Sequence, residues 1–374
     1  MCGGAASLFL LITARLAQGV GAAILMSLSV ALISRVVPKE RIGSAMGLVG
    51  ATSAVGTALG PSLGGGLLYL FGWQGVFLIH VPLTLLFFLA FKHLAPQEEQ
   101  PLHLKKSFDY TGTFLLATCL ASYALLMTLE ETFFCKTNAC FLLTCLISFG
   151  LFILTEQKAR FPLVPLGLFT QCASTGHLTM GIVTSGILMT NLVVGPYYLT
   201  HGMGLSTQVM GLVMSFGPLI VVMTGVPAGR LVDRYGTKSL TLVGLLSLSL
   251  GSFLLALIPV SFGIPGYLAP VTLIAGGYAL FQTANNTALM TDVMDHDRGM
   301  MSGLLNLSRY LGLMTGACAM GAVFAFATDT SHIETAPAQN VAVGMHATFA
   351  VTSILGACIA LLLLLRGWLR SQPR

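Results

Sequence analysis

Long apolar stretches separated by short polar connections run through the whole chain. Eleven of them are long enough for an α-helix to cross about 30 Å of hydrocarbon, which takes about 20 residues. They cover residues 8–33, 43–70, 76–94, 110–129, 133–155, 174–199, 207–228, 240–260, 266–290, 301–326 and 344–365. Each is apolar around the whole helical circumference, and the ten-residue alternation typical of outer-membrane barrels does not occur. The pattern predicts an all-α polytopic membrane protein, a helix bundle with about 11 transmembrane helices.

Composition favours the lipid bilayer as the environment of this chain. Of its 374 residues, 55% are hydrophobic and 8% are charged, whereas a soluble domain carries about 25% charged residues. So few charges cannot cover a water-exposed surface, which excludes soluble, disordered and nucleic-acid-binding proteins. Most of the eight cysteines lie inside apolar stretches. They are therefore interpreted as small core residues, not as a disulfide framework or a metal site.

Lysine and arginine mark one side of the membrane. Of the 18 such residues, fifteen lie in one set of connections and in the C-terminal tail. Lys136 alone lies in the opposite set, and Arg15 and Arg309 lie within spans. Cytoplasmic connections carry an excess of Lys and Arg. We therefore expect a plasma (inner) membrane protein with a cytoplasmic C-terminus, and the odd number of spans then places Met1 outside.

An internal repeat relates two parts of the chain at a shift of 256 residues. Residues 41–65 match residues 298–321, with one residue of slip at the start. Four glycines coincide in each copy: Gly47, Gly56, Gly60 and Gly65 fall on Gly303, Gly312, Gly316 and Gly321. Parallel repeats of this kind are typical of transporters built from two halves. The alternative is chance matching in a glycine-rich chain. The charged turns before the two copies also align, which argues against chance.

Four stretches carry a family resemblance. They are LLITARLAQGVGAA (10–23), GTALGPSLGG (56–65), FGWQGVFLIHVP (71–82) and GRLVDRYGTK (229–238). The first resembles the R-x-x-Q-G-x-G-A pattern of the fourth span in drug exporters of the major facilitator superfamily. The others resemble the antiporter motif of the fifth span, the start of the sixth span with His80 in place of the expected Asn, and the cytoplasmic loop motif G-x-x-x-D-R-x-G-x-K.

The chain thus resembles the major facilitator superfamily, in its fourteen-span drug:proton antiporter branch (EmrB/QacA type). In that scheme the eleven spans are the fourth to the fourteenth, so the first three are expected to be missing. The implied division is 1–95, a remnant of the N-terminal bundle with three spans, 96–162, two inserted spans, and 163–374, a C-terminal bundle of six spans.

The resemblance implies export of lipophilic or cationic drugs in exchange for protons, with the proton gradient as energy source, no cofactor and no enzymatic activity. An outer adaptor protein stays open as a further partner. Two alternatives stay open as well, a truncated membrane protein that transports nothing and a facilitator that imports a small metabolite. No G-x-x-x-x-G-K-[ST] loop occurs in the sequence, so direct use of ATP has no support.

The antiporter motif has a physical interpretation of its own. Its residues are Gly56, Gly60, Pro61, Gly64 and Gly65. Glycines four residues apart share one helical face, which allows another helix to approach closely, and a proline bends the helix. This face is expected at the interface of two halves that rock against each other. The alternative is ordinary helix packing.

Polar residues inside the spans are candidates for coupling or for lining the substrate path: Arg15, Gln18, Gly19, Gln282, Asn285, Asn286, Asn306 and Arg309. A charge in hydrocarbon normally faces a cavity or a partner. Arg15 alternatively extends its side chain to the outer surface, whereas Arg309 lies deeper and is expected to have a buried partner. The amides of 282–286 either line the path or bond a neighbouring helix.

The loop motif, Gly229, Asp233, Arg234, Gly236 and Lys238, is expected in a cytoplasmic turn. The resemblance implies that it pairs charges across neighbouring helix ends and stabilises one conformation; the alternative is a solvated turn. The cluster TDVMDHDR (291–298) is interpreted as a charged turn and not as a metal site. None of the thirteen acidic residues is expected at mid-membrane, although proton-coupled exporters generally need such a carboxylate.

The charge bias predicts the sidedness of two cysteines. Cys135 and Cys140 flank Lys136 and are expected outside, either as free thiols or, alternatively, as a disulfide. A membrane-impermeant maleimide should label free thiols here in intact cells, whereas a Lys105→Cys variant should react at its new thiol only after the cells are opened. Labelling in the reverse order would overturn the topology.

Overall fold

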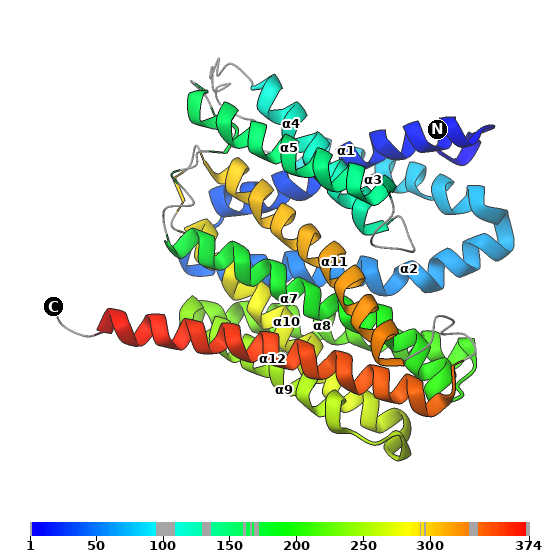
Figure 1. The fold of residues 1–374 in the computed structure, drawn as a ribbon. Coiled ribbons are helices and arrows are strands. Elements are labelled where there is room, and N and C mark those ends of the chain that lie inside the picture. Colours follow the sequence, from blue (N-terminus) through cyan, green and yellow to red (C-terminus); the bar gives the residue numbers. More distant parts are fainter. Residues whose placement is uncertain are drawn as a thin grey trace.

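The structure, a computed structural model, describes residues 2–94, 109–128, 136–159, 162–164, 167, 172–291, 293–294, 297–328 and 336–371. Eleven long helices account for most of them: α1 (Leu8–Val36), α2 (Ile42–Leu78), α3 (His80–Leu94), α4 (Tyr110–Thr128), α5 (Lys136–Lys158), α7 (Cys172–Tyr197), α8 (Thr207–Tyr235), α9 (Thr237–Leu257), α10 (Gly263–Thr291), α11 (Arg298–Thr328) and α12 (Ala338–Ser371). No β-strand occurs among the described residues. The all-α fold is confirmed, and α1 begins and α12 ends at opposite ends of the bundle (Figure 1).

The eleven long helices lie where the sequence predicts the eleven spans. Within the described part of the chain, nine helices are long and apolar enough to cross a membrane, or ten if Leu67–Leu78 and His80–Leu89, which are bent by 44° against each other, form one span. The difference lies in residues 42–94, where the sequence predicts two spans. Gly72 breaks α2 with a φ of 68°, a value that glycine adopts without strain. Gly72 lies between the predicted spans 43–70 and 76–94, and the chain bends again before His80.

Six helices surround the main apolar core. In this bundle α10 lies against α8 and α9, α11 lies against α7, and α12 lies against α9 and α11. Their fully buried side chains include Leu245, Leu248, Ile274, Phe281 and Phe349. Glycine 236 separates α8 from α9 at a φ of 83°, so the chain turns there without a loop. These six helices form the frame on which the remaining ones are placed.

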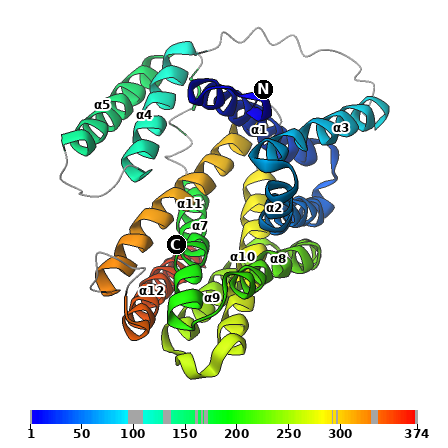
Figure 2. The same ribbon diagram turned by 90° about the vertical axis from the view of Figure 1, so that its right-hand side faces the viewer.

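The other helices pack on this frame to different extents. α1 lies against α11, and α2 lies against α8 and α10, whereas α4 and α5 pair with each other at one edge of the bundle (Figure 2). The Tyr123 and Thr315 hydroxyls share a hydrogen bond, and the Cys318 thiol donates to the Met127 carbonyl at 2.6 Å, so α4 meets the frame at α11. The division at residues 95 and 162 stays a prediction.

The α2–α8 contact is a crossing of glycine backbones. A Cβ added at Gly229 would lie 2.5 Å from the Gly43 carbonyl oxygen, and one added at Gly47 would overlap the Gly225 carbonyl oxygen. Ala51 continues the contact, since a Cβ added at Gly225 would lie 2.8 Å from the Ala51 Cβ. The two backbones therefore touch over the first three turns of α2.

The expected packing face of the antiporter motif is not where the helices meet. A Cβ added at Gly56, Gly60 or Gly64 meets nothing within 4 Å among the described residues, while the side-chain surroundings of Pro61 and Gly65 lie outside the described part of the chain. At 100° per residue, Gly60 points about 140° away from Gly47. Among the described residues no helix packs on these three glycines, because α8 approaches α2 from the other side. The role of this face at the interface of the two halves stays a prediction.

Two glycine-to-alanine substitutions in α2 should therefore differ in their effect on stability. Gly47→Ala places a methyl group against the Gly225 carbonyl, and we expect the stability to fall by about 1–3 kcal/mol, as for other overpacked contacts. Gly60→Ala, the matched control, should keep or slightly raise the melting temperature. Thermal unfolding of the two purified variants in detergent measures the difference. Equal melting temperatures would contradict the backbone crossing.

Candidate functional site

A central cavity of about 370 Å³ opens between α1, α2, α10 and α11. Two smaller hollows of about 80 and about 30 Å³ adjoin it, the first towards α7 and α8 and the second towards α7. Gln282 and Arg309 line all three. The remaining residues around the largest are Met26, Ser29, Val30, Met46, Val49, Gly50, Thr52, Ser53, Thr283, Asn286 and Asn306. Its size is within the usual range for small-molecule sites.

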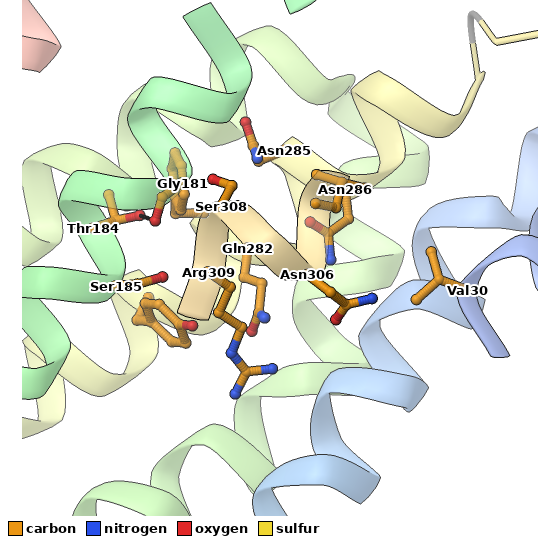
Figure 3. A pocket seen from close by; sticks show the side chains of 13 residues that line it. Val30, Gly181, Thr184, Ser185, Gln282, Asn285, Asn286, Asn306, Ser308 and Arg309 are labelled. Atoms are coloured by element: carbon orange, nitrogen blue, oxygen red, sulfur yellow. Dashed lines mark hydrogen bonds between the residues drawn. The ribbon is translucent and has the colours of Figure 1, made fainter. Parts of the chain in front are cut away.

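Four of the eight candidates for coupling or path lining meet at this cavity. Gln282 and Asn286 are one turn apart on α10, and Asn306 and Arg309 are one turn apart on α11. Their side chains extend towards the same space (Figure 3). The amides provide donors and acceptors, so the cavity wall is polar but carries few charges.

Asn285 has a different role from its neighbours on α10. It is buried, and its Oδ1 lies 2.8 Å from the Nδ1 of His177 on α7. The helix-bonding interpretation of the amide patch is thus met by Asn285, and the path-lining role of Gln282 and Asn286 stays a prediction. Asn285 bonds a neighbouring helix, whereas Gln282 and Asn286 line the space. The sequence provides no signal for His177, because its partner is 108 positions away.

Two serines that were not candidates fix α11 beside the cavity. The Ser302 hydroxyl donates to the Ser27 carbonyl of α1, and the Ser308 hydroxyl donates to the Leu178 carbonyl of α7, both at 2.6 Å. Further along, Gly312 lies against the backbone of α7. α11 is thus bonded to α7 at the residue before Arg309 and to α1 about two turns earlier.

Arg309 has no partner of the predicted kind among the described residues. Its Nε is buried and has no hydrogen-bond partner among the described residues. The described lining of the three hollows contains no Asp or Glu. No ion pair joins Arg309 to an acidic residue of the described chain, so the buried partner expected for it stays a prediction. The cavity therefore contains an arginine without an ion pair from the described chain.

Arg15 lies apart from this site. Its guanidinium donates to the Gln18 Oε1 at 3.0 Å and lies 5.4 Å from the centre of the Phe77 ring. Arg15 is exposed, and a Cβ added at the neighbouring Gly19 meets nothing within 4 Å. Arg15, Gln18 and Gly19 do not belong to the lining of any of the three hollows described above. This part of α1 thus forms a separate polar group, and its role in coupling stays a prediction.

The loop motif contacts the start of another helix. Asp233, near the end of α8, accepts hydrogen bonds from the backbone N–H groups of Gly43 and Ser44 at 2.8 and 2.9 Å, and a third from the Ser44 hydroxyl. Free N–H groups and the positive end of the helix dipole attract an anion at a helix start. Asp233 therefore caps α2 from α8. It binds backbone groups and not the cationic partner that charge pairing implies.

The other motif residues surround this cap. Gly229 lies against Gly43, and Gly236 ends α8 at positive φ. Arg234 extends over the ring of its neighbour Tyr235, 5.3 Å from the centroid, and Lys238 is exposed at the start of α9. Each glycine is thus required by geometry, whereas the two basic residues face solvent or an adjacent ring.

Three of the four acidic or histidine residues in the cluster at 291–298 lie outside the described residues. Asp292, Asp295 and His296 are not among the described residues. Within the described ranges, no group of three or more His, Cys, Asp or Glu side chains is arranged to hold a metal ion.

Comparisons with known proteins agree with this architecture. The sequence profile of the Major Facilitator Superfamily matches residues 1–317. The chain is 31% identical to the riboflavin transporter RibZ of Clostridioides difficile (strain 630), over 87% of this chain and 70% of RibZ. It is 28% identical to the uncharacterized transporter YebQ of Escherichia coli (strain K12), over 100% of this chain and 78% of YebQ. It is 29% identical to the multidrug resistance protein Stp of Mycobacterium tuberculosis (strain CDC 1551 / Oshkosh), over 90% of this chain and 63% of Stp.

The Asp233 cap predicts a graded loss of stability. Asp233→Ala leaves two N–H groups at the start of α2 without an acceptor and should cost about 1–2 kcal/mol, as for other caps. Asp233→Asn keeps one acceptor oxygen and should cost less, and Ser44→Ala, which removes only the hydroxyl bond, should cost least. Melting temperatures of the purified variants test this order. An Asp233→Ala variant as stable as the parent would show that the cap does not stabilise the fold.

Proposed function

This chain belongs to the Major Facilitator Superfamily, and we propose that it exports lipophilic compounds, drugs among them, in exchange for protons. The observation that carries the proposal is the central cavity, which lies between α1 and α2 on one side and α10 and α11 on the other. Transporters of two halves bind substrate at the interface of the halves and rock around it. A cavity with this position, few charges in its wall and a mostly apolar hollow beside it suits a small, lipophilic substrate.

The contact between α2 and α8 beside the cavity supports alternating access. On the α2–α8 side, the halves meet through glycine backbones and the Asp233 cap, which consists of three hydrogen bonds to one helix start. These contacts involve no bond that either helix needs within itself, so they can open without unfolding either helix. We propose that they close the side of the membrane that holds the basic connections, which is the cytoplasmic side in this proposal.

The relatives support drug export, and one observation favours a second candidate function. Stp is named a multidrug resistance protein and RibZ a riboflavin transporter. The amides of Gln282, Asn286 and Asn306 provide several donors and acceptors on one wall, which suits a heteroaromatic metabolite as well as a drug. Uptake of such a metabolite is therefore the second candidate. The cationic drugs implied by the resemblance find no carboxylate in the described lining.

Export of the neutral lipophilic dye Nile red tests the proposal. Cells that express the chain should lose preloaded dye faster than vector cells, and a protonophore should abolish the difference. Gln282→Trp places a large ring where all three hollows meet and should reduce export to the vector level. Leu250→Trp, at a half-exposed position on α9, is the matched control and should export normally. Faster dye accumulation in expressing cells would favour uptake and contradict export.

A further inference from the structure

The central site has one sign of charge. The three hollows converge on Arg309, and the described residues that line them include no other charged side chain. An arginine side chain stays protonated in proteins, so the positive charge persists at every physiological pH. A charge at membrane depth is costly unless a partner compensates it. A ligand that supplies the opposite charge would gain this compensation.

Two buried donors at this site have no acceptor within the described part of the chain. They are the Nε–H of Arg309 and the hydroxyl of Tyr278, and both side chains line the two smaller hollows. A buried donor without an acceptor costs about 1–3 kcal/mol. A guanidinium and a phenol that face the same space match the two oxygens of a carboxylate, which accepts from an arginine in a fork geometry.

Next to these donors the wall becomes apolar. The hollow of about 80 Å³ is lined by Leu188 on α7, Val221 on α8 and Ile274 on α10, and Gln282 and Arg309 line it as well. A ligand with its acidic group at Arg309 would therefore place an apolar body among these side chains. The polar and apolar parts of the site are adjacent, as an amphipathic ligand requires.

We propose that the site binds lipophilic organic anions, with a carboxylate on Arg309 and Tyr278 and an apolar body beside Leu188, Val221 and Ile274. This inference rests on the proposed transport function and names the substrate class of the same site. It reverses the preference for cations that the family resemblance implies. Arg15 is not an equivalent site, because Gln18 and Phe77 already partner it.

Two fluorescent ligands with the same ring system and opposite charge test the proposal directly. Anthracene-9-carboxylate and 9-(aminomethyl)anthracene are titrated against the purified chain in phosphatidylcholine nanodiscs, without a pH gradient. The carboxylate should bind at least about 10-fold more tightly than the amine, the minimum expected of a charge-assisted pair. Equal affinities, or tighter binding of the amine, would overturn the proposed substrate class.

Variants locate the binding to the site. Arg309→Gln should weaken binding of the carboxylate by about 10- to 100-fold and leave binding of the amine unchanged or stronger. Arg230→Gln removes the same charge from an exposed position on α8 and should change neither. Tyr278→Phe removes a single oxygen, so it decides the matter even if Arg309→Gln does not fold. It should weaken only the carboxylate, by about 5-fold.

The failures of the two proposals are distinguishable. Equal weakening of both ligands by Tyr278→Phe, or equal weakening of the carboxylate by the Arg230 and Arg309 variants, would refute the anion site. Nile red export without selective carboxylate binding would leave the transport function standing and refute the substrate class. Selective carboxylate binding without Nile red export would support the substrate class and contradict export of neutral drugs.

Discussion

The contact between the start of α2 and the end of α8 determines the arrangement around the site. Over three turns the two helices approach to backbone distance through Gly43, Gly47, Gly225 and Gly229, and Asp233 caps the first N–H groups of α2. Beyond Ala51 the helices separate, and the hollow lined by residues of both opens between them. The cavity thus follows from the tightness of the crossing. Side chains at the glycine positions would hold α2 further from α8 along its whole length and would also remove the N–H groups from the reach of the carboxylate.

Polar groups in the bundle are used in two ways. Ser302, Ser308 and Asn285 bond groups on other helices, which is the usual role of small polar side chains between transmembrane helices. Arg309 and Tyr278 lie beside them without such bonds within the described chain. The bonded residues stabilise the bundle and hold α10 and α11 in place. The unbonded ones provide free hydrogen-bond donors for a ligand in the cavity. The first group makes the second possible, because an unpaired arginine on a loosely held helix would turn towards the bilayer surface.

The sequence predicts the helices, their polarity and the chemical nature of the site, but not which helices meet. Apolar length locates each helix, although the break at Gly72 needs backbone geometry to be recognised. Residue spacing shows that Gln282 and Asn286 share a face of α10, and that Gly56, Gly60 and Gly64 share a face of α2. It cannot show which neighbour covers a face, so the glycines that meet α8 turn out to be Gly43 and Gly47. His177, Ser302 and Ser308 are invisible to motif reasoning, since each bonds a residue more than 100 positions away.

The internal repeat also shows that a shared residue pattern does not reveal which helices meet. Gly312 and Gly316 of α11 lie against the backbone of Ile182 and Gly186 on α7, whereas their repeat equivalents Gly56 and Gly60 on α2 meet nothing within 4 Å in the described chain. Conversely, Gly47 overlaps α8, and its equivalent Gly303 meets nothing. One glycine pattern thus serves two different contacts, and each copy uses the part that the other leaves open. The contact that joins α2 to the C-terminal helices therefore lies at the start of α2, one helical face away from the antiporter motif. Within the described residues, the close packing of α2 on α8 thus uses Gly43 and Gly47 and not Gly56 or Gly60.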